Sequence, residues 1–205
     1  RNNNWCINIS VWSLTESTIF VKIILRILNN YVYFFIKLCD FYIASSYNSC
    51  CGGKYQKGYI DKEILRMVLA CGARLVDFEI YSIDNKPVVA VSSVNDFTVK
   101  ESYNSIPTED VFNTIMNMAF SASKCPNASD PLILNFRIMS NNKPMYDTLA
   151  KQISSILNSK ILGVDYSFEY GGKNLGAVPI KNFLNKIIIF ADGSNPLFQN
   201  TKLDE

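Results

Sequence analysis

Short runs of β-branched and aromatic residues alternate with amphipathic stretches along most of the chain. The runs predict strands over residues 41–44, 74–81, 87–92, 131–138 and 186–192. Apolar residues at helical spacing predict helices over 61–71, 108–122 and 146–158, with Asp61 and Thr108 as N-caps. Alternation of helices with nearly continuous apolar strands is typical of a parallel sheet covered by helices, so the sequence predicts an α/β fold.

The first 37 residues follow a different pattern. Residues 19–38 are mostly apolar, and their polar positions recur at spacings near three and four, which predicts a helix with one narrow basic stripe. The longest uncharged stretch, residues 27–36, is shorter than the roughly 20 residues that a membrane-spanning helix needs. Three interpretations stay open: a helix that packs over an open end of the domain, an interfacial helix at a membrane surface, and a weak signal anchor.

Composition narrows the classes of function. The 205 residues provide one sizeable core, since 48% of them are hydrophobic. A net charge of only +2 argues against a nucleic-acid partner. The six cysteines include no CxxC pair, so the ligand spacing that is typical of zinc sites is missing. Mostly reduced thiols in a cytosolic protein are therefore expected. The chain has no histidine, which excludes any mechanism that needs imidazole as acid, base or metal ligand.

Two acidic residues share one face of the predicted strand at 74–81. Asp77 and Glu79 are two positions apart, so both side chains project from the same side of the strand. Buried carboxylates need a partner, which is either a hard metal ion or a guanidinium group, whereas a solvated strand end needs none. Arg137 lies near the carboxyl end of another predicted strand and is a candidate partner if the two strands are neighbours.

Several segments resemble the X region of phosphoinositide-specific phospholipase C. Residues 40–49 (DFYIASSYNS) are similar to its strand that runs into Ser-Ser-His-Asn-Thr, and residues 72–79 (GARLVDFE) to its Gly-Cys-Arg-x-x-Glu-x-Asp box. The later boxes follow in the family's order at residues 86–89, 110–120, 130–134 and 178–189. The chain also resembles the X-type phospholipase-like proteins of large DNA viruses of protists.

The resemblance implies a partial TIM-type (β/α) barrel, the X half of a phospholipase C-like phosphodiesterase barrel. It divides the chain into an N-terminal hydrophobic helical segment at 1–37, the X half-barrel at 38–192, and a linker at 193–205 toward a missing second half. Five predicted strands cannot close a barrel of eight, so a downstream half, another chain or the N-terminal helix is expected to cover the open edge.

The resemblance also implies which residues stand at the catalytic positions. The family's two catalytic histidines correspond to Tyr47 and to a position near Val91. A phenol with a pKa near ~10 is a poor proton shuttle at neutral pH, and valine carries no proton to exchange. The family's calcium ligands, one asparagine and three carboxylates, correspond to Asn48, Asp77, Glu79 and Arg137.

A fixed cation at Arg137 repels a metal ion. Our hypothesis is that Arg137 replaces calcium and pairs directly with Asp77 and Glu79. No cofactor is therefore expected, and calcium is expected at Asn48, Asp77 and Glu79 only if the ancestral site persists.

Three functions stay open. The favoured one is a phospholipase C-like domain that is catalytically inactive and serves in binding or assembly. The alternatives are an active phosphoric diester hydrolase that acts on phosphoinositide-like lipids without histidine, and a membrane-surface module that uses the helix at 19–38. Expected partners are a phospholipid head group or membrane surface, or a protein or downstream half that completes the barrel. The expected location is the cytoplasm or a virion, with the membrane periphery as a further alternative.

Overall fold

The computed structural model describes residues 35–54, 57–94, 100–166 and 174–204. The chain divides into two compact units. We call residues 45–161 with 185–205 the sheet unit, and residues 1–44 with 162–184 the minor unit. The predicted helix at 19–38 and its basic stripe lie largely outside the described residues.

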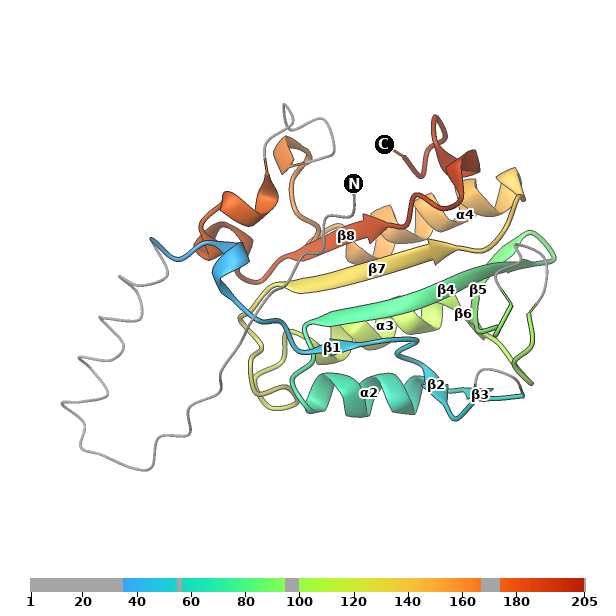
Figure 1. Cartoon of the computed structure of the whole chain (residues 1–205), viewed down its shortest axis with the longest axis horizontal. Helices are drawn as coiled ribbons and strands as arrows, with labels where there is room; N and C mark the ends of the chain where they lie inside the picture. Colours follow the sequence, from blue (N-terminus) through green and yellow to red (C-terminus); the bar gives the residue numbers. More distant parts are fainter. Residues whose placement is uncertain (1–34, 55–56, 95–99, 167–173, 205) are drawn as a thin grey trace. The chain divides into compact units, whose positions relative to one another are not determined.

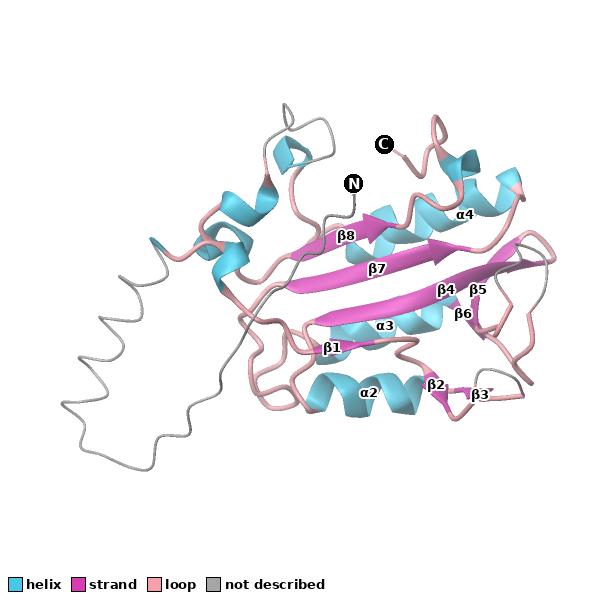
Figure 2. Cartoon of the chain, in the orientation of Figure 1, coloured by secondary structure: helices cyan, strands magenta, loops and turns pink. Residues whose placement is uncertain are grey.

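The sheet unit is built on one mixed sheet (Figure 2). Its strand order is β6 (Ile106–Pro107), β5 (Lys86–Ala90), β4 (Leu75–Ile83), β7 (Leu132–Ile138) and β8 (Ile187–Ala191). The short strand β1 (Ser45–Ser46) pairs with the first two residues of β4. Strands β1, β4, β7 and β8 are parallel, whereas β5 and β6 are antiparallel. A separate two-stranded ribbon joins β2 (Cys51–Gly52) to β3 (Tyr59–Ile60).

Three α-helices lie in the described part of this unit: α2 (Lys62–Ala70), α3 (Thr108–Met118) and α4 (Lys143–Gln152), the last continued by a π-helical turn at Ile153–Leu157. Figure 1 shows α3 and α4 along one face of the sheet. On that face the rings of Phe78 and Phe136 lie 6.3 Å apart, and the ring of Phe112 from α3 lies 5.9 Å from Phe136. The apolar residues of β4 and β7 therefore pack against helices, and the alternate residues face the other way.

Most of the predicted elements are present, but several differ from the prediction in their bounds or caps. Residues 41–44 are not a strand, because pairing with β4 begins at Ser45. Thr108 is not the N-cap of its helix but the first helical residue, and its hydroxyl donates to Pro87 O and contacts the side chain of Gln152. The helix predicted at 146–158 begins at Lys143, since Pro144 suits a first turn.

The predicted parallel arrangement fails at β5. Asp84 and Asn85 have φ angles of 50° and 62°, which is the left-handed backbone of a two-residue hairpin. This turn folds β5 back along β4, with Ser82 opposite Pro87. The sheet is consequently mixed: β7 and β8 lie parallel to β4 on one side, and on the other side the short strand β1 is parallel to β4 whereas β5 is antiparallel.

The described residues of the minor unit form short helical turns: η1 (Leu38–Asp40), η3 (Val164–Tyr166), η4 (Leu175–Ala177) and η5 (Ile180–Phe183). Lys37 forms an antiparallel bridge with Pro179, and the amide of Leu38 donates to Val178 O at 3.0 Å. None of the described helices is both long enough and apolar enough to cross a membrane.

The start of α2 gives a direct test of the local fold. Asp61 caps this helix by accepting a hydrogen bond from the amide of Glu63 at 2.9 Å. Asp61→Ala should lower the free energy of unfolding by about 1 kcal/mol, because the amide loses its acceptor. Asp61→Asn is the matched control and should lower the free energy of unfolding by only a few tenths of the loss for Asp61→Ala. Urea denaturation checks both, and equal losses for the two variants would contradict the cap.

Candidate functional site

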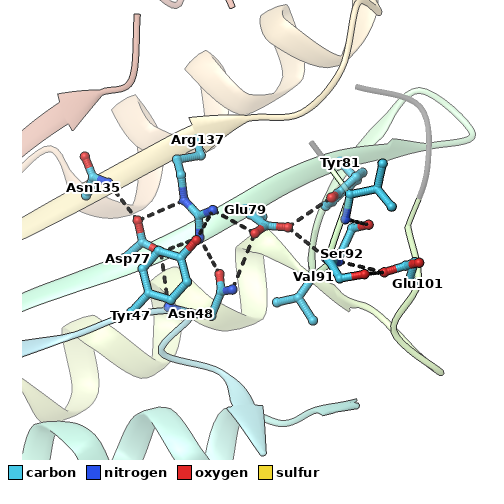
Figure 3. Close-up of polar contacts among 12 residues, drawn as sticks. Tyr47, Asn48, Asp77, Glu79, Tyr81, Val91, Ser92, Glu101, Asn135 and Arg137 are labelled. Atoms are coloured by element: carbon cyan, nitrogen blue, oxygen red, sulfur yellow. Dashed lines mark hydrogen bonds and ion pairs between the residues drawn. The ribbon is translucent and has the colours of Figure 1, made fainter. Parts of the chain in front are cut away.

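The site begins with the register between β4 and β7. Asp77 lies opposite Asn135 and Glu79 opposite Arg137 in this parallel pair. These four side chains project from the face of the sheet opposite to Phe78 and Phe136 (Figure 3). Parallel pairing therefore places two acids directly beside an amide and a guanidinium.

Arg137 forms ion pairs with both acids. Its Nη2 lies 2.6 Å from Oδ2 of Asp77, and its Nη1 lies 2.7 Å from Oε1 of Glu79. Its Nε donates to Oδ1 of Asp77 at 3.1 Å. The side chains of Asp77 and Glu79 are only 5% and 4% exposed, and that of Arg137 is 16% exposed. The guanidinium thus compensates two buried negative charges.

The remaining N–H groups of Arg137 are also used. One Nη1 hydrogen goes to the phenol oxygen of Tyr47 at 2.7 Å, and one Nη2 hydrogen goes to Oδ1 of Asn48 at 2.6 Å. Together with the three bonds to the acids, all five N–H donors of the guanidinium have acceptors within the protein.

Both carboxylates are saturated in the same way. Asp77 accepts a hydrogen bond from Asn135 Nδ2 at 2.7 Å and one from the backbone amide of Asn48 at 3.1 Å, in addition to two from Arg137. Glu79 accepts four hydrogen bonds, from Arg137, from Asn48 Nδ2, from the phenol of Tyr81 and from the backbone amide of Ser92. Each carboxylate therefore has four donors, as many as its lone pairs accept. We call Tyr47, Asn48, Asp77, Glu79, Asn135 and Arg137 the Arg137 cluster.

A strained turn brings Asn48 into the cluster. Asn48 has φ 46° and lies two residues after the end of β1, and asparagine tolerates this left-handed backbone better than most residues. Ser49 secures the turn to β4: its amide donates to Asp77 O at 2.9 Å, and its hydroxyl accepts from the Asp77 amide at 3.0 Å. The sequence SSYNS is thus held against β4 at the position of the acids.

Tyr47 covers the guanidinium from outside. The carbon atom Cζ of Arg137 lies 4.3 Å from the centre of the Tyr47 ring, in cation–π geometry. Tyr47 itself is 60% exposed, so its ring forms part of the outer surface. The phenol oxygen accepts a hydrogen bond from the cation, as Figure 3 shows.

The electrostatics keep the arginine charged. Burial by itself lowers the pKa of Arg137, but the hydrogen bonds to Asp77 and the charges of Asp77 and Glu79 outweigh it and raise the pKa above its usual value. Burial also raises the pKa of the Tyr81 phenol, and the neighbouring Glu79 carboxylate raises it further. Tyr81 therefore stays neutral at physiological pH and acts as a hydrogen-bond donor.

The structure brings together five of the six predicted site residues: Tyr47, Asn48, Asp77, Glu79 and Arg137. Val91 lies apart from their polar contacts, since its side chain is 1% exposed and belongs to the hydrophobic core. The neighbouring Ser92 is the residue that reaches the cluster, and it does so through its backbone amide.

Three contributors were missed from the sequence: Asn135, Tyr81 and Ser92. Asn135 and Arg137 alternate along β7 as Asp77 and Glu79 do along β4, and this shared period of two is a signal for Asn135. Tyr81 continues the period on β4. A backbone amide contact such as that of Ser92 does not depend on the residue type, so the sequence does not indicate it.

The cluster does not fit the calcium ion that the family resemblance implies. Asn48, Asp77 and Glu79 are suitable oxygen ligands, but their oxygens already accept from Arg137, whose fixed charge repels a second cation. Within the described part of the chain, no group of three or more His, Cys, Asp or Glu residues could hold a metal ion.

A pocket of about 340 Å³ opens beside the cluster. We call it the site pocket. It is lined by residues of five segments: Tyr47, Glu79, Ser92, Ser93, Val94, Arg137, Met139, Asp192 and Ser194. Arg137 and Asp192 lie at or just beyond the carboxyl ends of β7 and β8, where α/β folds place their ligands.

The mixed sheet with polar groups at the carboxyl ends of its parallel strands has the site arrangement of an α/β protein. The model of the family "Phosphatidylinositol-specific phospholipase C, X domain" matches residues 35–192, so the chain belongs to this family. The family and the partial-barrel fold predicted from the sequence are confirmed.

Solved structures agree on the fold. The crystal structure of PLC21 from L. pealei is 23% identical with a TM-score of 0.56, and covers 72% of this chain. That of PLC21 from S. officinalis is 22% identical with a TM-score of 0.58, and covers 76%. This chain spans only 17% and 18% of those two proteins. Comparison with curated protein sequences gives no match.

Removing the guanidinium should destabilise the protein strongly. Arg137→Ala leaves two buried carboxylates without a counter-charge and should lower the free energy of unfolding by about 3–5 kcal/mol. Arg66→Ala is the matched control, because Arg66 pairs with Glu63 at 3.0 Å but its side chain is 46% exposed; its loss should be under about 1 kcal/mol. Chemical denaturation at neutral pH measures both.

A neutral triple variant keeps this test informative if Arg137→Ala does not fold. Asp77→Asn, Glu79→Gln and Arg137→Leu together remove all three charges and should be more stable than Arg137→Ala alone. A triple variant less stable than the single one would contradict charge compensation as the role of Arg137.

Proposed function

We propose that this chain is a catalytically inactive phospholipase C X domain that serves as a binding or assembly module. The observation that carries the proposal is the closed Arg137 cluster, in which one guanidinium bonds to Asp77 at 2.6 Å and to Glu79 at 2.7 Å. Because the five donors of Arg137 and both carboxylates are engaged within the protein, these three side chains offer no free donor or lone pair to a reacting group.

The lack of an acid–base pair supports the proposal. The chain contains no histidine. Tyr47 stands at one of the two corresponding positions, and its phenol oxygen is engaged by Arg137. Val91 stands near the other, inside the core. Proton transfer contributes about 10²–10⁴-fold to such reactions, and neither residue supplies it near neutral pH.

The position of Arg137, where the family resemblance implies a calcium ligand, supports the proposal further. A calcium ion offers open coordination positions to a substrate, whereas a guanidinium satisfied by five internal acceptors does not. Polarising a phosphate would require breaking bonds from Arg137 to groups that are themselves buried.

The edge of the sheet supports a role in assembly. Among the described residues, β8 pairs with β7 along its length and with Ile161 at its first residue, and no strand pairs with its outer side beyond Ile187. Phe190 on this strand is 41% exposed. An unpaired strand edge is a template for strand addition. We propose that another chain, or another part of the same protein, adds a strand here.

The cytoplasmic, virion or membrane-peripheral location and the viral origin stay predictions.

Hydrolysis assays test the inactivity. The purified chain should release no more inositol phosphate from phosphatidylinositol vesicles than a buffer blank, with or without calcium. Release above the blank that disappears in Arg137→Ala and persists in Arg66→Ala would overturn the proposal in favour of a hydrolase without histidine.

Calorimetry tests the exchange of metal for arginine. The wild-type chain should show no saturable calcium binding. Arg137→Glu restores a third carboxylate beside Asn48, Asp77 and Glu79 and should bind calcium at roughly 10⁻⁴–10⁻³ M, the range of weak oxygen sites. Arg137→Gln removes the charge without adding a carboxylate and should bind more weakly. Saturable binding by the wild type that is lost in Asp77→Ala would contradict the exchange.

A further inference from the structure

The site pocket is poor in hydrogen-bond donors. All five N–H groups of Arg137 are used within the Arg137 cluster. The backbone amides of the lining loops are used as well, and their acceptors are Glu79 for Ser92, Glu101 for Ser93, the Ser92 hydroxyl for Val94, and Asp192 for Ser194. A phosphate group depends on such N–H donors, and here it would have to displace internal acceptors.

The pocket is also negatively charged. Among its described lining residues Arg137 is the one cation, and Glu79 and Asp192 are anions. Asp77 adds a further negative charge behind Arg137. Three carboxylates against one guanidinium leave an excess of two negative charges, which repels an anion and attracts a cation.

Asp192 has capacity for a ligand. Its Oδ1 accepts from the amide of Ser194 at 2.9 Å, and among the described residues it forms no ion pair and its Oδ2 accepts no hydrogen bond. Its own amide donates to Phe136 O at 2.8 Å, which fixes the residue beside β7. A half-buried carboxylate on a fixed backbone is suited to an ammonium group.

We propose that the site pocket binds a small hydroxylated ligand carrying a primary ammonium group, such as an amino sugar. The ammonium group bonds to Asp192, and the hydroxyl groups bond to the serine hydroxyls at Ser92 and Ser194. The volume of about 340 Å³ suits a ligand with a single ring. The inference rests on the proposed role as a binding module and gives that role a ligand class.

Three sugars of the same ring size test the charge preference. The purified 205-residue chain is titrated with D-glucosamine, D-glucose and D-glucose 6-phosphate, followed by amide chemical shifts. At about pH 6 the amine is protonated. Glucosamine should bind about tenfold more tightly than glucose, the factor that one charge-assisted hydrogen bond provides. Glucose 6-phosphate should bind more weakly than glucose.

Two matched variants locate the effect. Asp192→Asn should reduce the affinity for glucosamine to that for glucose. Asp84→Asn makes the same change on the β4–β5 turn, where asparagine tolerates φ 50°, and should keep the tenfold preference. The inference is overturned if glucose 6-phosphate binds most tightly, if Asp192→Asn keeps the preference, or if none of the three sugars binds.

The outcome is separate from that of the hydrolysis assay. A chain that hydrolyses phosphatidylinositol overturns the proposed inactivity whatever the sugars do. A chain that is inactive but does not distinguish glucosamine from glucose overturns only the ligand class.

Discussion

The structure of the site depends on one requirement, the compensation of two carboxylates buried on the same face of a sheet. Moving a carboxylate from water into a protein interior costs several kcal/mol even after relaxation. Asp77 and Glu79 lie on β4 with side chains that are 5% and 4% exposed, so this cost applies to both. Arg137 on the neighbouring strand offsets this cost, because the parallel register places it opposite Glu79 and two residues along from the position opposite Asp77.

The identity of the compensating cation decides what the site does. A metal ion leaves coordination positions for water or substrate. A guanidinium belongs to the chain and directs its five donors in one plane. Here those donors end on Tyr47, Asn48, Asp77 and Glu79, and the carboxylates are completed by neighbouring amides and a phenol. Charge compensation by a side chain therefore closes the same cluster that a metal would leave open.

The sequence predicted the parts of this arrangement that follow from periodicity. Alternation placed Asp77 and Glu79 on one face, and a second strand placed Arg137 at the same rim; the structure brings all three together. Features that depend on backbone geometry were not predictable in this way. The hairpin at Asp84 reverses β5 against the expected parallel order, because two left-handed residues suffice for a tight turn.

Contacts made by the backbone were equally hidden. The backbone amide of Ser92 donates to Glu79, whereas the predicted Val91 points into the core, and residue type does not distinguish the two positions.

Nuclear magnetic resonance of the arginine side chain tests the closed cluster most directly. The Nε–H and Nη–H signals of Arg137 should be resolved and slow to exchange with water at neutral pH, and those of the exposed Arg66 should exchange rapidly. Rapid exchange at Arg137, equal to that at Arg66, would contradict a guanidinium whose donors are all engaged.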